Sequence, residues 1–164
     1  MTFKTADLSD LHEGDALDGR VQVVHPGLFN FGGKSRFHGE IVTIRALGDF
    51  SQVREQVRSA GLGKVLVVDN DASMQVAMLG DLLAAAGVDN GWQGVVINGC
   101  IRDAADIASM DIGVKALATV PARGSRADLG ELNVELAFLG GVFRPGEFLY
   151  SDEDGILLSS TALI

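Results

Sequence analysis

The sequence contains a single cysteine, Cys100, so no disulfide can form within the chain, and this composition is typical of a reducing compartment. Because Cys100 lies beside an apolar run, we expect it to be a small buried residue. With only 3 prolines among 164 residues, a proline-rich linker is excluded. No apolar run approaches the ~20 residues of a membrane span, and Met1–Lys4 lacks an apolar signal region. We therefore expect a cytoplasmic protein with no membrane segment.

Basic residues are also in short supply. The chain has 13 lysines and arginines against 22 aspartates and glutamates, which gives a net charge of −9. Direct binding of nucleic acid requires a basic face, so this balance argues against such a partner and suits docking onto a basic protein. His12, His25 and His38 are widely separated and show no ligand spacing, so we expect loop or surface histidines rather than a metal site.

Apolar runs in the middle of the chain indicate parallel strands that are covered on both faces. These runs lie at residues 64–69, 95–97 and 114–120. Helical patterns lie at residues 50–60, 81–86 and 102–110, the last of which is either a helix or an irregular turn. We expect Gly61 and Gly87 to close the first two helices, and Gly80 to break the chain before the second.

Shorter elements are expected at both ends of the chain. A helix at Thr5–His12 would have Thr5 as its cap and Gly14 as its end. Short strands are indicated at residues 21–24, 41–47, 134–138, 142–143, 148–150 and 156–158. The last four of these strands follow Pro121 and alternate with glycine-containing turns, which is typical of an antiparallel meander. The sequence predicts one α/β domain over residues 1–164, with a parallel middle portion and antiparallel strands at both ends.

The central part of the chain offers a candidate site, because twenty residues separate Asp81 from the pair Arg102 and Asp103. In a right-handed βαβ unit, the N-terminus of the helix lies near the carboxyl ends of the flanking strands, where ligands bind. We expect Arg102 and Asp103 to reach that edge after a turn at Asn98–Gly99. The first-turn amides from Gly80 to Leu83 and the guanidinium could then hold a carboxylate, while Asp103 offers an oxygen ligand to a cation.

Simpler structural interpretations of the same residues stay open. Asp81 can be only a helix cap, and Arg102 with Asp103 only a surface ion pair. Trp92 precedes a strand and is expected to be a packing anchor, and the acidic run 152–154 is expected to be a turn.

Several motifs are shared with a known family, over about residues 23–158. They are Phe29–Gly33, Val65–Asp69, Gly91–Gly94, Asp111–Gly113, Pro145–Gly146 and Asp154–Gly155. The chain resembles the regulator of ribonuclease activity A family, whose members overlap with the class II 4-hydroxy-4-methyl-2-oxoglutarate aldolases. The aldolase branch is marked by an aspartate, twenty residues and then Arg-Asp, which this chain carries as Asp81 and Arg102-Asp103. Members that act only as ribonuclease regulators can lack the final aspartate.

The resemblance implies a three-layer β/β/α swivelling-domain fold and a homotrimeric ring, sometimes doubled to a hexamer, with sites at subunit interfaces. It implies that Arg102 and a set of backbone amides hold a pyruvate-type substrate, and that Asp103 attaches a divalent ion, Mg²⁺ or Mn²⁺. The amides in question belong to Gly80, Asp81, Leu82 and Leu83. Aldolases of the family often have a C-terminal extension that carries an acidic residue to the neighbouring site. Because this chain stops at Ile164, weaker or narrower activity is expected.

Two functions follow from the resemblance. The first is a metal-dependent aldolase that cleaves 4-hydroxy-4-methyl-2-oxoglutarate-type 2-oxo acids to pyruvate and also decarboxylates oxaloacetate. Arg102 would stabilise the oxygen charge that develops during cleavage, and Asp81 would position a water for proton transfer. The second is a non-catalytic protein that binds and inhibits ribonuclease E. The presence of Asp103 favours the first.

Overall fold

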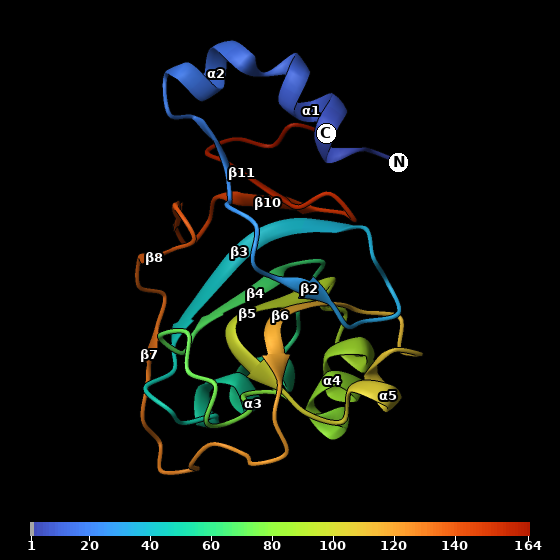
Figure 1. Cartoon of the computed structure of the whole chain (residues 1–164), viewed down its shortest axis with the longest axis vertical. Helices are drawn as coiled ribbons and strands as arrows, with labels where there is room; N and C mark the ends of the chain where they lie inside the picture. The colour runs from blue at the N-terminus through green and yellow to red at the C-terminus, as the bar shows by residue number, and fades with distance from the viewer. Residues whose placement is uncertain (1) are drawn as a thin grey trace.

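A mixed β-sheet runs through the middle of the molecule in the computed structural model, which describes residues 2–164 (Figure 1). Its strands follow the order β1-β11-β10-β3-β4-β5-β6-β2, with β7 also paired to β3. The strands of this sheet are β1 Val21–Val23, β2 Phe29–Asn30, β3 Phe37–Arg45, β4 Val65–Asp69, β5 Gly94–Ile101, β6 Gly113–Thr119, β7 Glu131–Leu132, β10 Phe148–Ser151 and β11 Ile156–Ser159. A separate hairpin consists of β8 Leu136–Phe138 and β9 Gly141–Phe143.

The centre of the sheet is parallel, as the sequence predicts. Strands β3, β4, β5 and β6 pair in parallel, whereas β10, β11 and β1 continue the sheet with antiparallel pairing and β2 closes the far edge against β6. Every residue of β5 is buried, and so is β4 as far as Val68. Burial on both faces explains why these strands read as continuous apolar runs.

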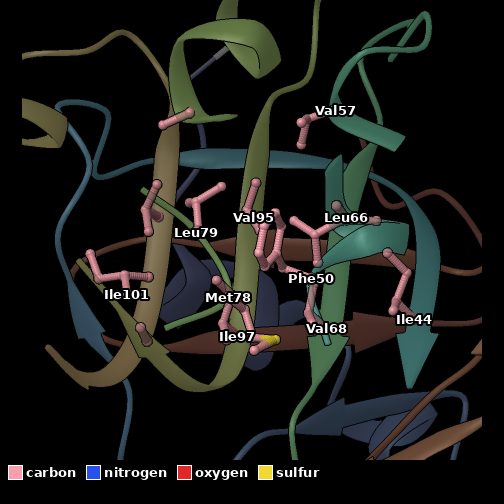
Figure 2. Packing of buried hydrophobic residues seen from close by; sticks show 14 of the residues in the cluster. Ile44, Phe50, Val57, Leu66, Val68, Met78, Leu79, Val95, Ile97 and Ile101 are labelled. Atoms are coloured by element: carbon pink, nitrogen blue, oxygen red, sulfur yellow. The ribbon is translucent and has the colours of Figure 1, made fainter. Parts of the chain in front are cut away.

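Three helices cover one face of the parallel portion (Figure 1). They are α3 Ser51–Val57, α4 Asp81–Asp89 and α5 Ala104–Ile107. Figure 2 shows Val57 of α3 with Leu66 of β4 and Val95 of β5 in the same buried cluster. Removal of these apolar side chains from water is the main source of the stability of the packing between the helices and the sheet.

The second face is covered by β-structure, and this arrangement confirms the expected β/β/α layering. Strands β8 to β11 contribute to a second buried cluster, in which the rings of Phe138 and Phe143 stack at 4.3 Å. Outside that layer, α1 Thr5–Leu11 and α2 Glu13–Leu17 lie at the end of the molecule beyond β10 and β11 (Figure 1). None of the helices described for residues 2–164 is both long enough and apolar enough to cross a membrane.

Two expectations about the N-terminal helix are wrong. Thr5 is the first helical residue rather than the cap, and its amide and hydroxyl both donate to the Asp152 carboxylate, at 2.7 and 2.6 Å. Gly14 does not end this helix, because α1 stops at Leu11 and Gly14 belongs to α2. The partner that fixes the start of α1 lies 147 residues away, so no local pattern could reveal it.

Both glycines expected to close central helices serve close packing instead. Helix α3 ends at Val57, and a Cβ atom at Gly61 would lie 2.6 Å from the Trp92 ring. Helix α4 continues through Gly87 to Asp89, and a Cβ at Gly87 would lie 2.9 Å from Ile112. Close packing against the Trp92 ring and backbone therefore requires glycine at Gly61, whereas a Cβ at Gly87 would require only the end of the Ile112 side chain to shift.

Candidate active site

An extended segment before α4 aligns the predicted site residues with the end of β5. Met78 donates its amide to the Cys100 carbonyl at 3.0 Å, and the Arg102 amide donates to the Leu79 carbonyl at 2.9 Å. Met78 and Leu79 also point into the core cluster (Figure 2). The two hydrogen bonds and the two buried side chains fix Gly80, so that α4 begins opposite Arg102.

This pairing replaces the turn that the sequence predicts at Asn98–Gly99. Both residues lie inside β5, which continues to Ile101 with an irregularity in its register between Ile97 and Cys100. Asn98 is buried and donates its side-chain amide to the Asp69 carboxylate at 2.9 Å. The expectation of a turn was wrong because Asn and Gly are common turn residues, and only the neighbouring strands show that they are paired here.

The first turn of α4 already binds carboxylate oxygens. The Asp81 amide donates to Asp103 Oδ2 at 3.1 Å, and the Leu82 amide donates to Asp81 Oδ1 at 2.8 Å. Amides at a helix N-terminus have no partner within the helix and carry the positive end of its dipole, so they attract anions. A Cβ atom at Gly80 would lie 2.7 Å from Asp103 Oδ2, so glycine at this position allows the carboxylate to approach.

Arg102 and Asp103 stand side by side at this helix end. The Arg102 Nε atom lies 4.0 Å from Asp103 Oδ2, and the two side chains are 38% and 37% exposed. Asp103 has a left-handed backbone with φ of 56°, a conformation that aspartate and asparagine adopt more readily than most residues. The Arg102 Nη1 atom also donates to the Pro121 carbonyl at 3.5 Å. The structure therefore brings Gly80, Asp81, Arg102 and Asp103 together.

Two hollows adjoin this group, and Arg102 lines both. The larger, of about 290 Å³, is an open hollow shared with Asp103 and Pro121. The smaller, of about 40 Å³, is shared with Gly80, Leu83 and Arg123. Together they leave Arg102 and Asp103 accessible to a small molecule.

Arg123 is the residue at this site that sequence analysis missed. The Arg123 guanidinium lies 5.9 Å from the centre of the Phe50 ring, and its backbone is bridged to Ala77. The loop that carries it is tied to the buried Asp49 carboxylate, which accepts hydrogen bonds from Ser125 and Ala127. No spacing in the sequence signals these contacts, because they join segments more than forty residues apart.

The acidic side chains near α4 can offer a cation only one or two protein ligands, so water would have to supply the others. Among residues 2–164 no cluster of three or more histidine, cysteine, aspartate or glutamate side chains could hold a metal ion. Asp103 by itself offers one half-exposed carboxylate beside an open hollow. Mg²⁺ commonly keeps several waters and binds through one or two carboxylates, so the donor set suits such an ion and not a zinc-type cage.

Cys100, just before Arg102, and Trp92, at the opposite end of β5, have the structural roles expected for them. Cys100 is buried, burial raises the pKa of its thiol, and its Sγ atom contacts Met74 Sδ at 3.5 Å. Trp92 is buried and donates its indole N–H to the Ser59 carbonyl at 3.1 Å. A protonated thiol is a poor nucleophile, so Cys100 adds no chemistry to the site.

Comparison with known proteins identifies close relatives along the whole chain. The family model described as Aldolase/RraA matches residues 5–158. A Pseudomonas aeruginosa protein named "Putative 4-hydroxy-4-methyl-2-oxoglutarate aldolase" is 50% identical over 163 residues, which cover 99% of this chain and 98% of that protein.

Solved structures also include relatives that are similar to this chain over nearly its whole length. The RNA-processing inhibitor RraA from Thermus thermophilus is 36% identical, with a TM-score of 0.93 over 100% of this chain and 96% of that one. A Geobacillus kaustophilus protein described as an S-adenosylmethionine:2-dimethylmenaquinone methyltransferase is 40% identical, with a TM-score of 0.92 over 98% of this chain and 97% of that one. The architecture described above is therefore shared by relatives that bear different functional names.

Proposed function

The chain belongs to the RraA-like family, and on this premise we propose that it is a divalent-metal-dependent carbon–carbon lyase. Its substrates would be 2-oxo acids of the 4-hydroxy-4-methyl-2-oxoglutarate type, cleaved to pyruvate, with oxaloacetate decarboxylation as a companion activity. The observation that carries the proposal is the meeting of the α4 N-terminus, Arg102 and Asp103 at one accessible place. The name of the Pseudomonas aeruginosa relative supports it.

Substrate binding is assigned to the groups that attract carboxylates. The α4 amides of Asp81 and Leu82 donate to the carboxylate oxygens of Asp103 and Asp81, and a carboxylate is the chemical group that a 2-oxo acid presents. Arg102 can grip a carboxylate with two parallel hydrogen bonds, and Arg123 adds a second positive charge on the wall of the smaller hollow. These groups would fix the position of the bond to be cleaved.

The resident metal ion would be Mg²⁺ or Mn²⁺, held by Asp103 and otherwise by water. Such an ion supplies Lewis-acid stabilisation of the negative charge that develops on the 2-oxo oxygen as the carbon–carbon bond breaks. Arg102 would add to this stabilisation from its position beside Asp103.

Two proton transfers accompany retro-aldol cleavage: the C4 hydroxyl loses a proton, and the enolate carbon gains one. Asp81 Oδ1 accepts the Leu82 amide, and its second carboxylate oxygen has no hydrogen bond within residues 2–164. That oxygen could orient a water for one of the two transfers. Decarboxylation of oxaloacetate needs the same enolate stabilisation but no hydroxyl base, so it should depend less on Asp81.

Gly80→Ala tests the close approach of Asp103 to α4. The added Cβ would overlap Asp103 Oδ2, which is the free end of a side chain, so the carboxylate should move while the fold stays intact. We expect pyruvate formation to fall by about tenfold or more, because displacement by about 1 Å in an active site is costly. The melting temperature should change little.

Gly14→Ala is the matched control, since a Cβ at that position meets nothing within 4 Å. It should leave pyruvate formation unchanged. Full activity in the Gly80→Ala variant would contradict the assignment of this helix end to the site.

The enzymatic proposal is tested by measuring pyruvate release from a panel of 2-oxo acids. We expect release from 4-hydroxy-4-methyl-2-oxoglutarate and from oxaloacetate, both abolished by a chelator. Substrates without a carboxylate next to the oxo group should not react, because the α4 amides and Arg102 would lose their ligand. No release from any 2-oxo acid in the presence of Mg²⁺ or Mn²⁺ would reject the proposal.

A second candidate function is inhibition of ribonuclease E. It is favoured by the Thermus thermophilus relative, which is described as an RNA-processing inhibitor, and by the net charge of −9, which suits a basic partner. Inhibition of purified ribonuclease E, weakening as salt concentration rises, is the expected result for this function. Assembly into a trimer or hexamer belongs to both proposals, and light scattering tests it.

A further inference from the structure

A second pocket lies on the opposite side of the sheet from α4. Its volume is about 340 Å³, which lies within the usual range for small-molecule sites. Its walls are the loop from Val24 to Asn30, the turn from Glu153 to Ile156, and Lys115 of β6. Lys115 precedes the end of β6 at Thr119 by four residues, or about 13 Å along a strand, so this pocket is separate from the group around Asp103.

Lys115 is the unusual residue of this pocket. Its neighbours Val114 and Ala116 pack into the cluster under the helices, so alternation along the strand directs Lys115 to the other face. The residue as a whole is only 3% exposed, but its amine is not among the fully buried unpartnered atoms of residues 2–164, so we infer that the amine opens onto the pocket, where no hydrogen bond or ion pair to the protein holds it. Water or a ligand in the pocket must therefore complete the hydrogen bonds of this amine.

Two carboxylates near Lys115 form hydrogen bonds or ion pairs with other residues instead. Asp152 accepts hydrogen bonds from Thr5, and Glu153 accepts one from the Ser35 hydroxyl at 2.6 Å and pairs with Arg36 at 3.4 Å. His25 and Asp154 also line the pocket. Burial lowers the pKa of the Lys115 amine, and the Asp152 and Glu153 carboxylates oppose this effect. The net result is a larger neutral, nucleophilic fraction than an ordinary lysine has at neutral pH.

We propose that Lys115 is a reactive amine that captures a small uncharged aldehyde or ketone as an imine in this pocket. The amine nitrogen attacks the carbonyl carbon, and the carbonyl electron pair moves to oxygen, which takes up the proton lost by nitrogen. The resulting carbinolamine then loses one water to form the C=N bond, so no oxidant or reductant is needed.

The pocket walls define the class of carbonyl compound. Val24, Leu28, Phe29 and Ile156 contribute apolar surface for a short carbon chain. Glu153 and Asp154 place negative charge at the same pocket, which disfavours an anionic ligand. This preference is the opposite of the one proposed at α4, where a carboxylate is required.

Competitive reductive labelling of the native protein tests the proposal without any substitution. The protein is treated with propanal and cyanoborohydride at pH 7, and the modified lysines are quantified by peptide mass spectrometry. The other three lysines, Lys4, Lys34 and Lys64, serve as internal references. We expect Lys115 to react at least about three times faster than each of them, because its neutral fraction is higher. In urea the four rates should become equal.

Two results would overturn the proposal. The first is labelling of Lys115 at or below the rate of the three reference lysines in the native protein. The second is a larger rate advantage of Lys115 over the reference lysines with glyoxylate, an anionic aldehyde, than with propanal, because the pocket would then select for negative charge. Neither result depends on pyruvate release, so the test is independent of the function proposed for Asp103.

Discussion

Asp103→Asn is expected to reduce metal-dependent pyruvate formation by about 100-fold or more, because a bound metal ion contributes several kcal/mol of transition-state stabilisation. Asparagine keeps the side-chain shape and tolerates the left-handed backbone that Asp103 adopts, so the fold should survive. It lacks the negative charge that attracts the cation. The measurement is the initial rate of pyruvate release at saturating Mg²⁺, together with the circular dichroism spectrum.

Asp106→Asn is the matched control, because Asp106 is an exposed carboxylate on the adjacent helix α5. It should retain the parent rate. If Asp103→Asn and Asp106→Asn are equally active, Asp103 holds no catalytic ion.

Asp49→Asn is expected to lower the free energy of unfolding by about 3 kcal/mol, because it breaks a network of buried charge-assisted hydrogen bonds. The fully buried carboxylate accepts the Ser51 amide at 2.8 Å, the Ser125 hydroxyl at 2.7 Å and the Ala127 amide at 2.6 Å. An asparagine amide nitrogen cannot accept, so it would face these donors unpaired. Urea unfolding measures the change, and Glu55→Gln at an exposed position of α3 is the control.

The contribution of Asp49 to the free energy of unfolding should also depend on pH. Burial alone would raise the pKa of this carboxyl, but hydrogen bonds from Ser51, Ser125 and Ala127 lower it from 3.8 to about 2. A carboxyl with a depressed folded-state pKa stabilises the protein above its unfolded pKa and loses that contribution as the pH falls through the folded value. The stability difference between the parent and Asp49→Asn should therefore be constant above pH 5 and shrink between about pH 4 and 2. A difference that stays constant down to pH 2 would contradict this account.

The central strands could be predicted well from the sequence because their environment leaves a local signature. The run Lys64–Asp69 predicts β4 to within one residue, since a strand buried on both faces must be apolar throughout. Helix ends were predicted less well. Gly61 and Gly87 pack against Trp92 and Ile112, and that reason for glycine is visible only in the folded chain.

The proximity of Asp81, Arg102 and Asp103 was predicted, but for an incomplete reason. The βαβ argument correctly places the start of α4 near the end of β5, whereas the expected turn at Asn98–Gly99 is part of the strand. The hydrogen bonds of Met78 and Leu79 to β5 create the alignment instead. Arg123 and Lys115 were not singled out, because a loop crossing and the burial of one side chain depend on contacts between distant segments. The chemical roles of the site residues stay predictions.

We propose that Asp103 holds a divalent ion that makes this protein a 2-oxo acid lyase. The most direct test is to remove metal with a chelator and then measure pyruvate release from 4-hydroxy-4-methyl-2-oxoglutarate as Mg²⁺ or Mn²⁺ is added back. We predict that the stripped protein is inactive, and that added metal restores activity in a saturable way in the parent but not in Asp103→Asn. Pyruvate release that persists in the stripped protein, or equal restoration in both proteins, would show that Asp103 holds no catalytic ion.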